Sequence, residues 1–492
     1  MGEERVELRK PGYKWSLEMI VDNSLGRLGF IIFAALIGLS FTIVAVAQES
    51  KLSPETQQSI DRIAKQSLIQ MGAPSASVAI VKDGQIVYVH AYGTARIDPL
   101  TAAREEMRYS IGSISKQFTA TAILMLAEQG KLSLDDPVSK YLPDLTRAKE
   151  VTIRQLLSHT SGYQDYWPQD YVPPMMLQPI SAQKILDLWA RKPLDFDPGS
   201  KWQYSNTNYV IAGLIVEKAS GSPLLEFLQK RVFAPLGMKR VDNVDQHALG
   251  ATDAVGYMRY ALGPPRVAPK EGPGWLFAAG ELAMPAEELA KWDIGVIGQR
   301  LLKPSSYTEM ENEVRLKNGS GTGYGLGLQV GAVGGHRVLA HGGEVSGFTS
   351  QNSIYPDDKV AIVVLTNEDA NGAAGAIARQ IANLLLAPPD SAGAAKLAQA
   401  EKIFIGLQHG TIDRTLFTDN ANAYFTPQAL DDFASSLGPL GDPMDITATR
   451  EQGRGGMIYR GYTVTFPRRT VRIIAFEMPD GKLEQFIVSA SN

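Results

Sequence analysis

A serine and a lysine three residues apart, Ser113 and Lys116, could act as a nucleophile and its base. Gly112 precedes the serine and a helix-compatible stretch follows it, so both side chains would share one face of the first helical turn. An exposed lysine is protonated, but a lysine buried between a helix and a sheet can lose enough basicity to accept or relay the serine proton. The pattern alone is weak, because chance supplies about one such tetrapeptide in a chain of this length. This sequence has a second, Ser181 to Lys184.

Two further patterns carry side chains suited to the same chemistry. Tyr204 and Asn206 form the single Tyr-x-Asn pattern of the chain. Tyrosine can carry a proton if cationic neighbours lower its pKa, and an asparagine amide can hold a substrate amide while bonding the lysine. His341 ends an apolar run and precedes Gly342 and Gly343, where a strand could approach a ligand closely and offer N–H groups and a histidine donor. Taken alone, each pattern also fits a purely structural role.

The order Ser-x-x-Lys, Tyr-x-Asn, His-Gly-Gly resembles that of the class C-type serine β-lactamase-related family. This family includes class C β-lactamases, D-Ala-D-Ala carboxypeptidases, D-aminopeptidases and esterases. The similarity covers roughly residues 52–387, and the second Ser-x-x-Lys lacks such surroundings. It includes, in family order, the stretches GKLSLDDPVSKYLP, VTIRQLLSHTSGY, FDPGSKWQYSNTNYVIAGLIVEKASG, PLGM and YGLGL. The resemblance implies an α+β fold of the β-lactamase/transpeptidase type, in which an antiparallel sheet flanked by helices is joined by a helical lobe, and it implies no cofactor.

The resemblance also implies roles for the residues that match the family motifs. Ser113 would be the acylated nucleophile and Lys116 its activating partner. Tyr204 would be a proton shuttle that also helps to activate the deacylating water, and Asn206 would contact a substrate amide and the lysine. The oxyanion hole would consist of the backbone N–H groups of Ser113 and Glu344.

The sequence departs from the family pattern at two places. His341, with Gly342 and Gly343, stands where β-lactamases usually have Lys-Thr-Gly, so a permanent cation and a hydroxyl that recognise the antibiotic carboxylate are missing. We therefore expect acyl transfer without efficient β-lactam hydrolysis. Within AAGELAMPAEELAKW, residues 278–292, Glu281 stands where the family usually has a second glycine. Its carboxylate would either narrow the acyl pocket, or repel an anionic substrate, or point to solvent.

These patterns predict a serine hydrolase that acts through an acyl-enzyme on amide or ester bonds of D-amino-acid peptides, esters or β-lactam-like substrates. The alternative is a penicillin-binding or sensor module that is acylated without efficient turnover. A Ser-His-Asp hydrolase is disfavoured because the chain has no Gly-x-Ser-x-Gly. A zinc enzyme is disfavoured because it has no His-x-x-x-His and no cysteine. No metal site is predicted.

Composition limits the number of domains and the kinds of partner that the chain can have. The chain has 492 residues, of which 44% are hydrophobic and 20% are charged, and this size suits two or three globular domains. A net charge of -4 without a concentrated basic cluster disfavours nucleic acid as a partner. A small-molecule or peptide substrate is expected instead. Oligomeric state is not predicted.

Periodicity predicts the elements that must position these residues. We expect a helix at 54–71, a hairpin of strands 76–81 and 85–93 around Asp83-Gly84, and mainly helices over 111–300 with an N-cap at Thr152. Strands should return at YGLGLQV (324–330), HRVLAH, FTSQNSIY and KVAIVVLTN, before a closing helix near 387. Two terminal halves that share a sheet, with a helical lobe between them, place a cleft at their junction.

Four segments follow from these patterns. Residues 1–50 contain a charge-free run, 28–47, that ends in Ala45-Val46-Ala47 and reads as a signal peptide or membrane anchor. Export to the periplasm or the extracellular space is expected, with membrane association if the run is retained. Residues 51–387 form the hydrolase domain and 388–395 a linker. Residues 396–492 form a small α+β domain of three helices and four strands, with no nucleophile pattern of its own and no readable role.

Overall fold

The computed structural model describes residues 52–386, 391–467 and 469–490. The predicted signal peptide or anchor at 28–47 lies outside these residues. Within them, no helix combines the length and apolarity needed to span a bilayer.

Residues from both ends of the predicted hydrolase domain build one antiparallel sheet of seven strands. In spatial order the strands are β3 Thr101–Ala102, β2 Gln85–Arg96, β1 Ser75–Lys82, β12 Val360–Thr366, β11 Phe348–Tyr355, β10 His336–Val345 and β9 Gln329–Val333. The central pairing of β1 with β12 confirms that the two terminal halves share a sheet. Asp83 and Gly84, both with positive φ, form the predicted hairpin turn between β1 and β2.

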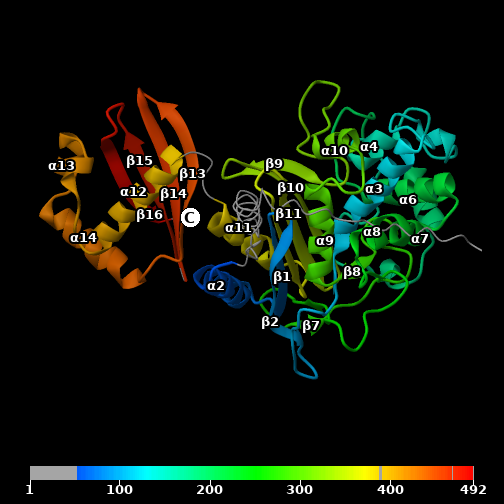
Figure 1. Ribbon diagram of the computed structural model, residues 1–492, viewed down its shortest axis with the longest axis horizontal. Coiled ribbons are helices and arrows are strands. Elements are labelled where there is room, and N and C mark those ends of the chain that lie inside the picture. Colours follow the sequence, from blue (N-terminus) through cyan, green and yellow to red (C-terminus); the bar gives the residue numbers. More distant parts are fainter. Residues whose placement is uncertain (1–51, 387–390, 468, 491–492) are drawn as a thin grey trace, which may run out of the picture. The chain divides into compact units, whose positions relative to one another are not determined.

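Helices cover both faces of this sheet (Figure 1). α2 (Pro54–Met71) and α11 (Ala373–Leu385) pack together on one face, and α9 (Ala286–Ile297) packs on the other, against β1 and β12. Because both faces are covered, every residue of β12 is buried and its sequence is almost wholly apolar. α2 has the bounds predicted from its periodicity.

A helical lobe lies between the two halves of the sheet in sequence, as predicted. Its helices are α3 Ser115–Glu128, α4 Ile153–Leu157, α5 Ala182–Ile185, α6 Asn206–Ser220, α7 Leu224–Leu228, α8 Ala234–Leu236 and α10 Pro304–Glu311. The lobe also contains short strands. β8 (Leu282–Met284) pairs with β4 (Tyr109–Ser110) on one side and with β5 (Asp242–Asn243) on the other, and β6 (Tyr257–Met258) pairs with β7 (Arg266–Val267). Thr152 caps α4 in a capping box with Gln155, which confirms the predicted N-cap.

The prediction for residues 324–330 was wrong in its placement. The strand β9 covers Gln329–Val333, and Tyr324 to Leu328 are irregular. Gly327 has a φ of 85°, which interrupts an extended run, while Leu326 and Leu328 are buried in the core. The alternation of apolar residues with glycine, which predicted a strand, instead belongs to an irregular segment that buries its leucine side chains in the core.

The C-terminal part has the three helices and four strands that the sequence predicts. They are α12 Ser391–Gln408, α13 Asp419–Tyr424, α14 Pro427–Leu437, β13 Asp445–Arg454, β14 Met457–Phe466, β15 Arg469–Glu477 and β16 Leu483–Ala490. The strands form an antiparallel sheet in sequential order, with a hydrophobic core of its own. The second half of the predicted linker 388–395 is helical in the structure, because α12 begins at Ser391.

Glu281 does not face solvent, and it is not among the described residues that line the cavity around Ser113, so the expectations that it points to solvent or narrows the acyl pocket were wrong. Its side chain is buried, and one carboxyl oxygen accepts a 2.9 Å hydrogen bond from Asn243 Nδ2. Burial, followed by the nearby Asp245 carboxylate, raises the pKa of Glu281 to about 8. Burial of an ionised carboxylate is costly, so the form of Glu281 that the interior favours is the neutral acid.

This burial predicts a pH-dependent stability. Because folding raises the pKa of Glu281 from 4.5 to about 8, its contribution to stability is present below about pH 4.5 and is lost as the pH rises through about 8. We expect the melting temperature of the wild type to fall over this range by several degrees more than that of Glu281→Gln, measured by calorimetry. Glu226→Gln, at an exposed carboxylate on α7, is the control. Parallel curves for all three proteins would contradict the assignment.

Candidate active site

Ser113 and Lys116 lie where the segment after β4 enters α3. Ser113 is in a single 3₁₀ turn, Gly112–Ile114, and Lys116 is in the first turn of α3. The Lys116 side chain is fully buried, as the catalytic hypothesis required, and its Nζ lies 2.9 Å from Ser113 Oγ. The second Ser-x-x-Lys is a helix cap: Ser181 Oγ accepts from the Lys184 N–H at the start of α5.

Lys116 Nζ contacts three oxygen atoms. Besides Ser113 Oγ, it lies 2.8 Å from Asn206 Oδ1 and 2.8 Å from the Ala279 carbonyl oxygen. The amide and carbonyl oxygens can only accept hydrogen bonds. A neutral amine has two hydrogens, which match these two acceptors, and one lone pair, which is then directed at the Ser113 hydroxyl. The geometry thus suits removal of the serine proton by Lys116.

The electrostatic environment favours that neutral amine. Burial lowers the pKa of Lys116 to about 7, and the Asp165 carboxylate acts in the opposite direction. Among the described residues, no carboxylate lies within ion-pair distance of Nζ. A lysine whose pKa is about 7 is half neutral at pH 7, so it can both accept a proton and return one.

Tyr204 lies against Lys116, but its pKa moves in the direction opposite to the sequence-based hypothesis. Lys116 Nζ is 5.0 Å from the centre of the Tyr204 ring. Burial raises the pKa of Tyr204, a hydrogen bond with Ser113 opposes the rise, and Asp165 adds to it. The resting residue is therefore a phenol, which can donate a proton and cannot act as the initial base.

Asn206 begins α6 and is held on both sides. Its Oδ1 accepts from Lys116, while its N–H donates to Asp165 Oδ1 at 2.9 Å and its Nδ2 lies 3.4 Å from Asp165 Oδ2. The side-chain amide is thereby oriented with oxygen toward the lysine. One Nδ2 hydrogen is left for a substrate carbonyl.

His341 lines the cavity on β10, but it does not present a free donor. Its Nδ1 lies 2.5 Å from the Gly342 carbonyl oxygen, which can only accept, so Nδ1 carries the proton. Its Nε2 then accepts from the Tyr324 hydroxyl at 2.8 Å. Burial, followed by the charge of Lys116, lowers the pKa of His341 to about 3. The expected histidine donor to a substrate is thus replaced by a neutral ring with both nitrogens bonded inside the protein.

Two glycines bring β10 against the turn that carries Ser113. A Cβ atom on Gly343 would lie 1.9 Å from the Ile111 carbonyl oxygen, and one on Gly112 would lie 2.8 Å from the Glu344 nitrogen. Only glycine therefore permits this approach, and Gly112 also has a positive φ of 51°. The backbone nitrogens of Ser113 and Glu344, the predicted oxyanion donors, belong to the two segments that meet here.

β10 also leaves a free edge at the site. β9 pairs with β10 only from His336 to Ala340, whereas β11 pairs with it as far as Val345. The edge of residues 341–344 that faces away from β11 is consequently not covered by β9. An extended substrate could lie along it.

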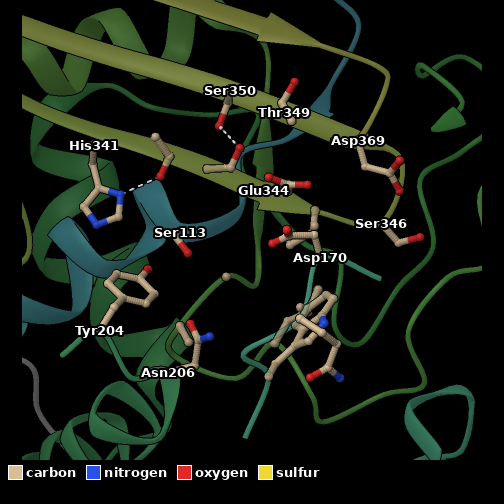
Figure 2. Close-up of a pocket in the computed structure, with 18 of the residues that line it drawn as sticks. Ser113, Asp170, Tyr204, Asn206, His341, Glu344, Ser346, Thr349, Ser350 and Asp369 are labelled. Atoms are coloured by element: carbon tan, nitrogen blue, oxygen red, sulfur yellow. Dashed lines mark hydrogen bonds between the residues drawn. The ribbon is translucent and has the colours of Figure 1, made fainter. Parts of the chain in front are cut away.

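A cavity of about 780 Å³ opens over Ser113. Figure 2 shows Tyr204 and His341 on one side of Ser113, with Asp170, Glu344 and Asp369 beyond it on the other. Among the described residues that line this cavity, none is lysine or arginine. Burial raises the pKa of Glu344, a hydrogen bond from the Ala370 N–H opposes the rise, and the Asp170 and Asp369 carboxylates add to it. This end of the cavity thus carries three carboxylates, and no lysine or arginine among the described lining residues offsets their charge.

Sequence reasoning missed three residues that touch the predicted site residues. Asp165 holds Asn206, Tyr324 holds His341, and His159 packs against Tyr204 with ring centres 4.3 Å apart. His159 and Tyr324 were inside stretches that resemble the family, VTIRQLLSHTSGY and YGLGL. Asp165 lies outside these stretches. For His159 and Tyr324 the family resemblance was a signal, but no spacing in the sequence connected either residue to Ser113.

Comparisons with known proteins identify the family of this chain. The model of the Beta-lactamase family matches residues 60–386. A D-aminopeptidase from Brucella anthropi is 30% identical over 322 residues, which are 64% of this chain and 59% of that protein. The chain therefore spans less than two thirds of this relative's length.

Two solved structures extend the comparison. A D-stereospecific amidohydrolase from Streptomyces sp. is 27% identical, with a TM-score of 0.58 over 65% of this chain and 96% of its own. The octameric penicillin-binding protein homologue from Pyrococcus abyssi has a TM-score of 0.60 over 89% of this chain and 96% of its own. Its 22% identity makes it a likeness of fold alone.

The Lys116 environment predicts a pH profile. If a neutral Lys116 activates Ser113, phosphonylation of Ser113 by a fluorophosphonate should rise with pH around a midpoint of about 7. Asp165→Asn keeps an acceptor for the Asn206 N–H but removes the charge that raises the pKa of Lys116. The midpoint should therefore move to lower pH. Glu344→Gln, which removes a carboxylate from the same cavity, should leave it in place; an unchanged or higher midpoint for Asp165→Asn would contradict the prediction.

Proposed function

This chain belongs to the beta-lactamase family, and we propose that it is a serine hydrolase that releases amino-terminal D-amino acids from amides and short peptides through an acyl-enzyme at Ser113. The observation that carries this substrate class is the cavity lining. Beyond Ser113 it has carboxylates and, among its described residues, no lysine or arginine.

Acylation begins at the Ser113–Lys116 contact. The neutral Lys116 amine accepts the hydroxyl proton as Ser113 Oγ bonds to the substrate carbonyl carbon, and the π electrons of the carbonyl move to its oxygen. The N–H groups of Ser113 and Glu344 would stabilise this oxyanion. When the C–N bond breaks, its electron pair leaves with nitrogen. Tyr204 donates a proton to that nitrogen and recovers one from the Lys116 ammonium, which leaves an acyl-serine ester and a free amine.

Deacylation uses the same groups with water. Water bonds to the ester carbonyl carbon while the Lys116–Tyr204 pair accepts its proton. The Ser113 Oγ–C bond then breaks, and Oγ regains a proton from that pair. The products are the amino acid and the free enzyme, so atoms and charge balance without a cofactor.

The position of Tyr204 determines how a substrate lies. The leaving nitrogen must come within reach of the Tyr204 hydroxyl, so the leaving group lies on the Tyr204 and His341 side of Ser113 (Figure 2). The acyl group then extends the other way, toward Asp170, Glu344 and Asp369. An amino acid acyl group carries its α-ammonium next to the carbonyl carbon, and these carboxylates are suited to attract it.

The same lining disfavours anionic substrates. A cation would stabilise the carboxylate of a β-lactam or of a peptide C-terminus, but His341 is neutral with both ring nitrogens bonded, and no lysine or arginine is among the described lining residues. The names of a D-aminopeptidase and a D-stereospecific amidohydrolase among similar proteins support D stereochemistry. The apolar run at residues 28–47 supports export, which would place the site outside the cytoplasm.

Leaving-group dependence tests the roles of Ser113 and Tyr204. Ser113→Ala should abolish fluorophosphonate labelling and all hydrolysis. Tyr204→Phe should lower kcat/KM for D-alaninamide by about 10²- to 10⁴-fold, because an amine must be protonated as it leaves. It should have a much smaller effect on D-alanine p-nitrophenyl ester, whose leaving group needs no proton. Equal losses on both substrates would overturn the role of Tyr204, and stable labelling of the wild type by a penicillin without release would favour a sensor.

Substrate charge tests the role of the carboxylates. Asp170→Asn with Glu344→Gln should lower kcat/KM for D-alaninamide by about 10-fold or more, since a hydrogen-bonded charge is worth roughly 1.5–3 kcal/mol. The N-acetylated amide, which has no ammonium, should be a poor substrate and should lose nothing in the variant. Glu344→Gln keeps an acceptor for the Ala370 N–H, so the loop should stay in place. Equal losses on both substrates would contradict ammonium recognition.

A further inference from the structure

His159 is a buried polar residue without an assigned role beside the catalytic groups. It lies between α4 and α6 in sequence, its exposed fraction is 0%, and its φ is 58°. Left-handed backbone is uncommon for a residue other than glycine, although histidine and asparagine tolerate it better than most. This conformation places both its main chain and its ring against residues 203–208.

Hydrogen bonds join His159 to the segment that carries Tyr204 and Asn206. The Gln203 N–H donates to the His159 carbonyl oxygen at 3.0 Å. The Ser205 N–H donates to His159 Nδ1 at 3.2 Å, from the residue that separates Tyr204 and Asn206. The acceptor role of Nδ1 puts the proton of the neutral ring on Nε2.

The imidazole also contacts two tyrosines with different tasks. Its ring centre lies 4.3 Å from that of Tyr204 and 4.9 Å from that of Tyr324, the residue that donates to His341. His159 thus contacts both the proton-carrying side chain, Tyr204, and the tyrosine that supports His341 on β10. A shift of this ring would therefore displace Tyr204 directly and His341 through Tyr324, and both Tyr204 and His341 line the cavity.

The histidine is not explained by packing. Its Nε2 is buried and has no hydrogen-bond partner among the described residues. An unsatisfied buried donor costs roughly 1–3 kcal/mol, a cost that an apolar ring of similar size would avoid. What an apolar ring cannot supply is an acceptor for the Ser205 N–H.

We propose that His159 is a positioning residue, which holds Tyr204 and Asn206 in their reactive places through the Ser205 N–H and through ring contact with Tyr204. The inference rests on the proposed hydrolase function and deepens it. His159 acts on the reaction only through these two residues and does not itself touch the substrate: it is absent from the described lining of the cavity.

Two substitutions separate positioning from packing. His159→Phe keeps a ring but removes the acceptor; His159→Asn loses the ring but supplies a short acceptor and suits the positive φ. If His159 positions Tyr204, His159→Phe should show the leaving-group signature of a displaced Tyr204. We expect a loss of about 10- to 100-fold in kcat for D-alaninamide, a much smaller loss for the p-nitrophenyl ester, and partial recovery of the amide rate in His159→Asn. Melting temperatures identify variants that fail to fold.

A double-substitution cycle completes the test. In a Tyr204→Phe background, His159→Phe should add little further loss for the amide, because the group it positions is already gone. Additive losses, or equal losses on amide and ester in a folded His159→Phe, would overturn the proposal. A wild type that is not labelled at Ser113 would instead refute the hydrolase function, so the two failures are distinguishable.

Discussion

The removal of one lysine side chain from water controls the chemistry of this site. An ammonium group transferred into a protein interior loses its hydration, and without an ion partner it is more stable after it gives up its proton. Among the described residues, the oxygens that Lys116 Nζ contacts are all neutral, and they come from the 3₁₀ turn before α3, from the start of α6 and from the loop before β8. In that loop Ala278 has a φ of 58°, immediately before the carbonyl that Lys116 contacts. One neighbouring turn and two distant segments are thus arranged to satisfy an amine and not to hold a cation.

Burial also determines the protonation of the groups around the lysine. Burial keeps the Tyr204 phenol protonated and the His341 ring neutral, so the floor of the cavity around Ser113 has few permanent charges. Charge is concentrated at the rim, where Asp170, Glu344 and Asp369 are closer to solvent. A neutral floor suits proton transfer near pH 7, and a charged rim suits selection of what enters. The two tasks are separated in space because they require opposite electrostatic environments.

Sequence predicted the parts of the structure that depend on local pattern. The bounds of α2, the β1–β2 hairpin, the Thr152 cap and the strands of the C-terminal sheet all follow from periodicity and turn chemistry. The pattern Ser113, Lys116, Tyr204, Asn206 was identified in order, and the structure brings these side chains together. What could not be predicted depends on contacts between distant segments, such as the hydrogen bond from Tyr324 to His341 or the burial of Glu281 against Asn243. In each case no spacing in the sequence connects the two partners.

The uncovered edge of β10 has a consequence for the molecule as a whole. A strand edge that can accept a substrate presents the same unpaired backbone groups that allow one protein chain to add to the sheet of another. Here that edge is short, it lies inside a cavity, and its end is marked by Glu344. A neighbouring molecule would have to bring a narrow, flexible segment past several negative charges to pair with it. The features that select substrates therefore also disfavour strand addition by another chain at this edge.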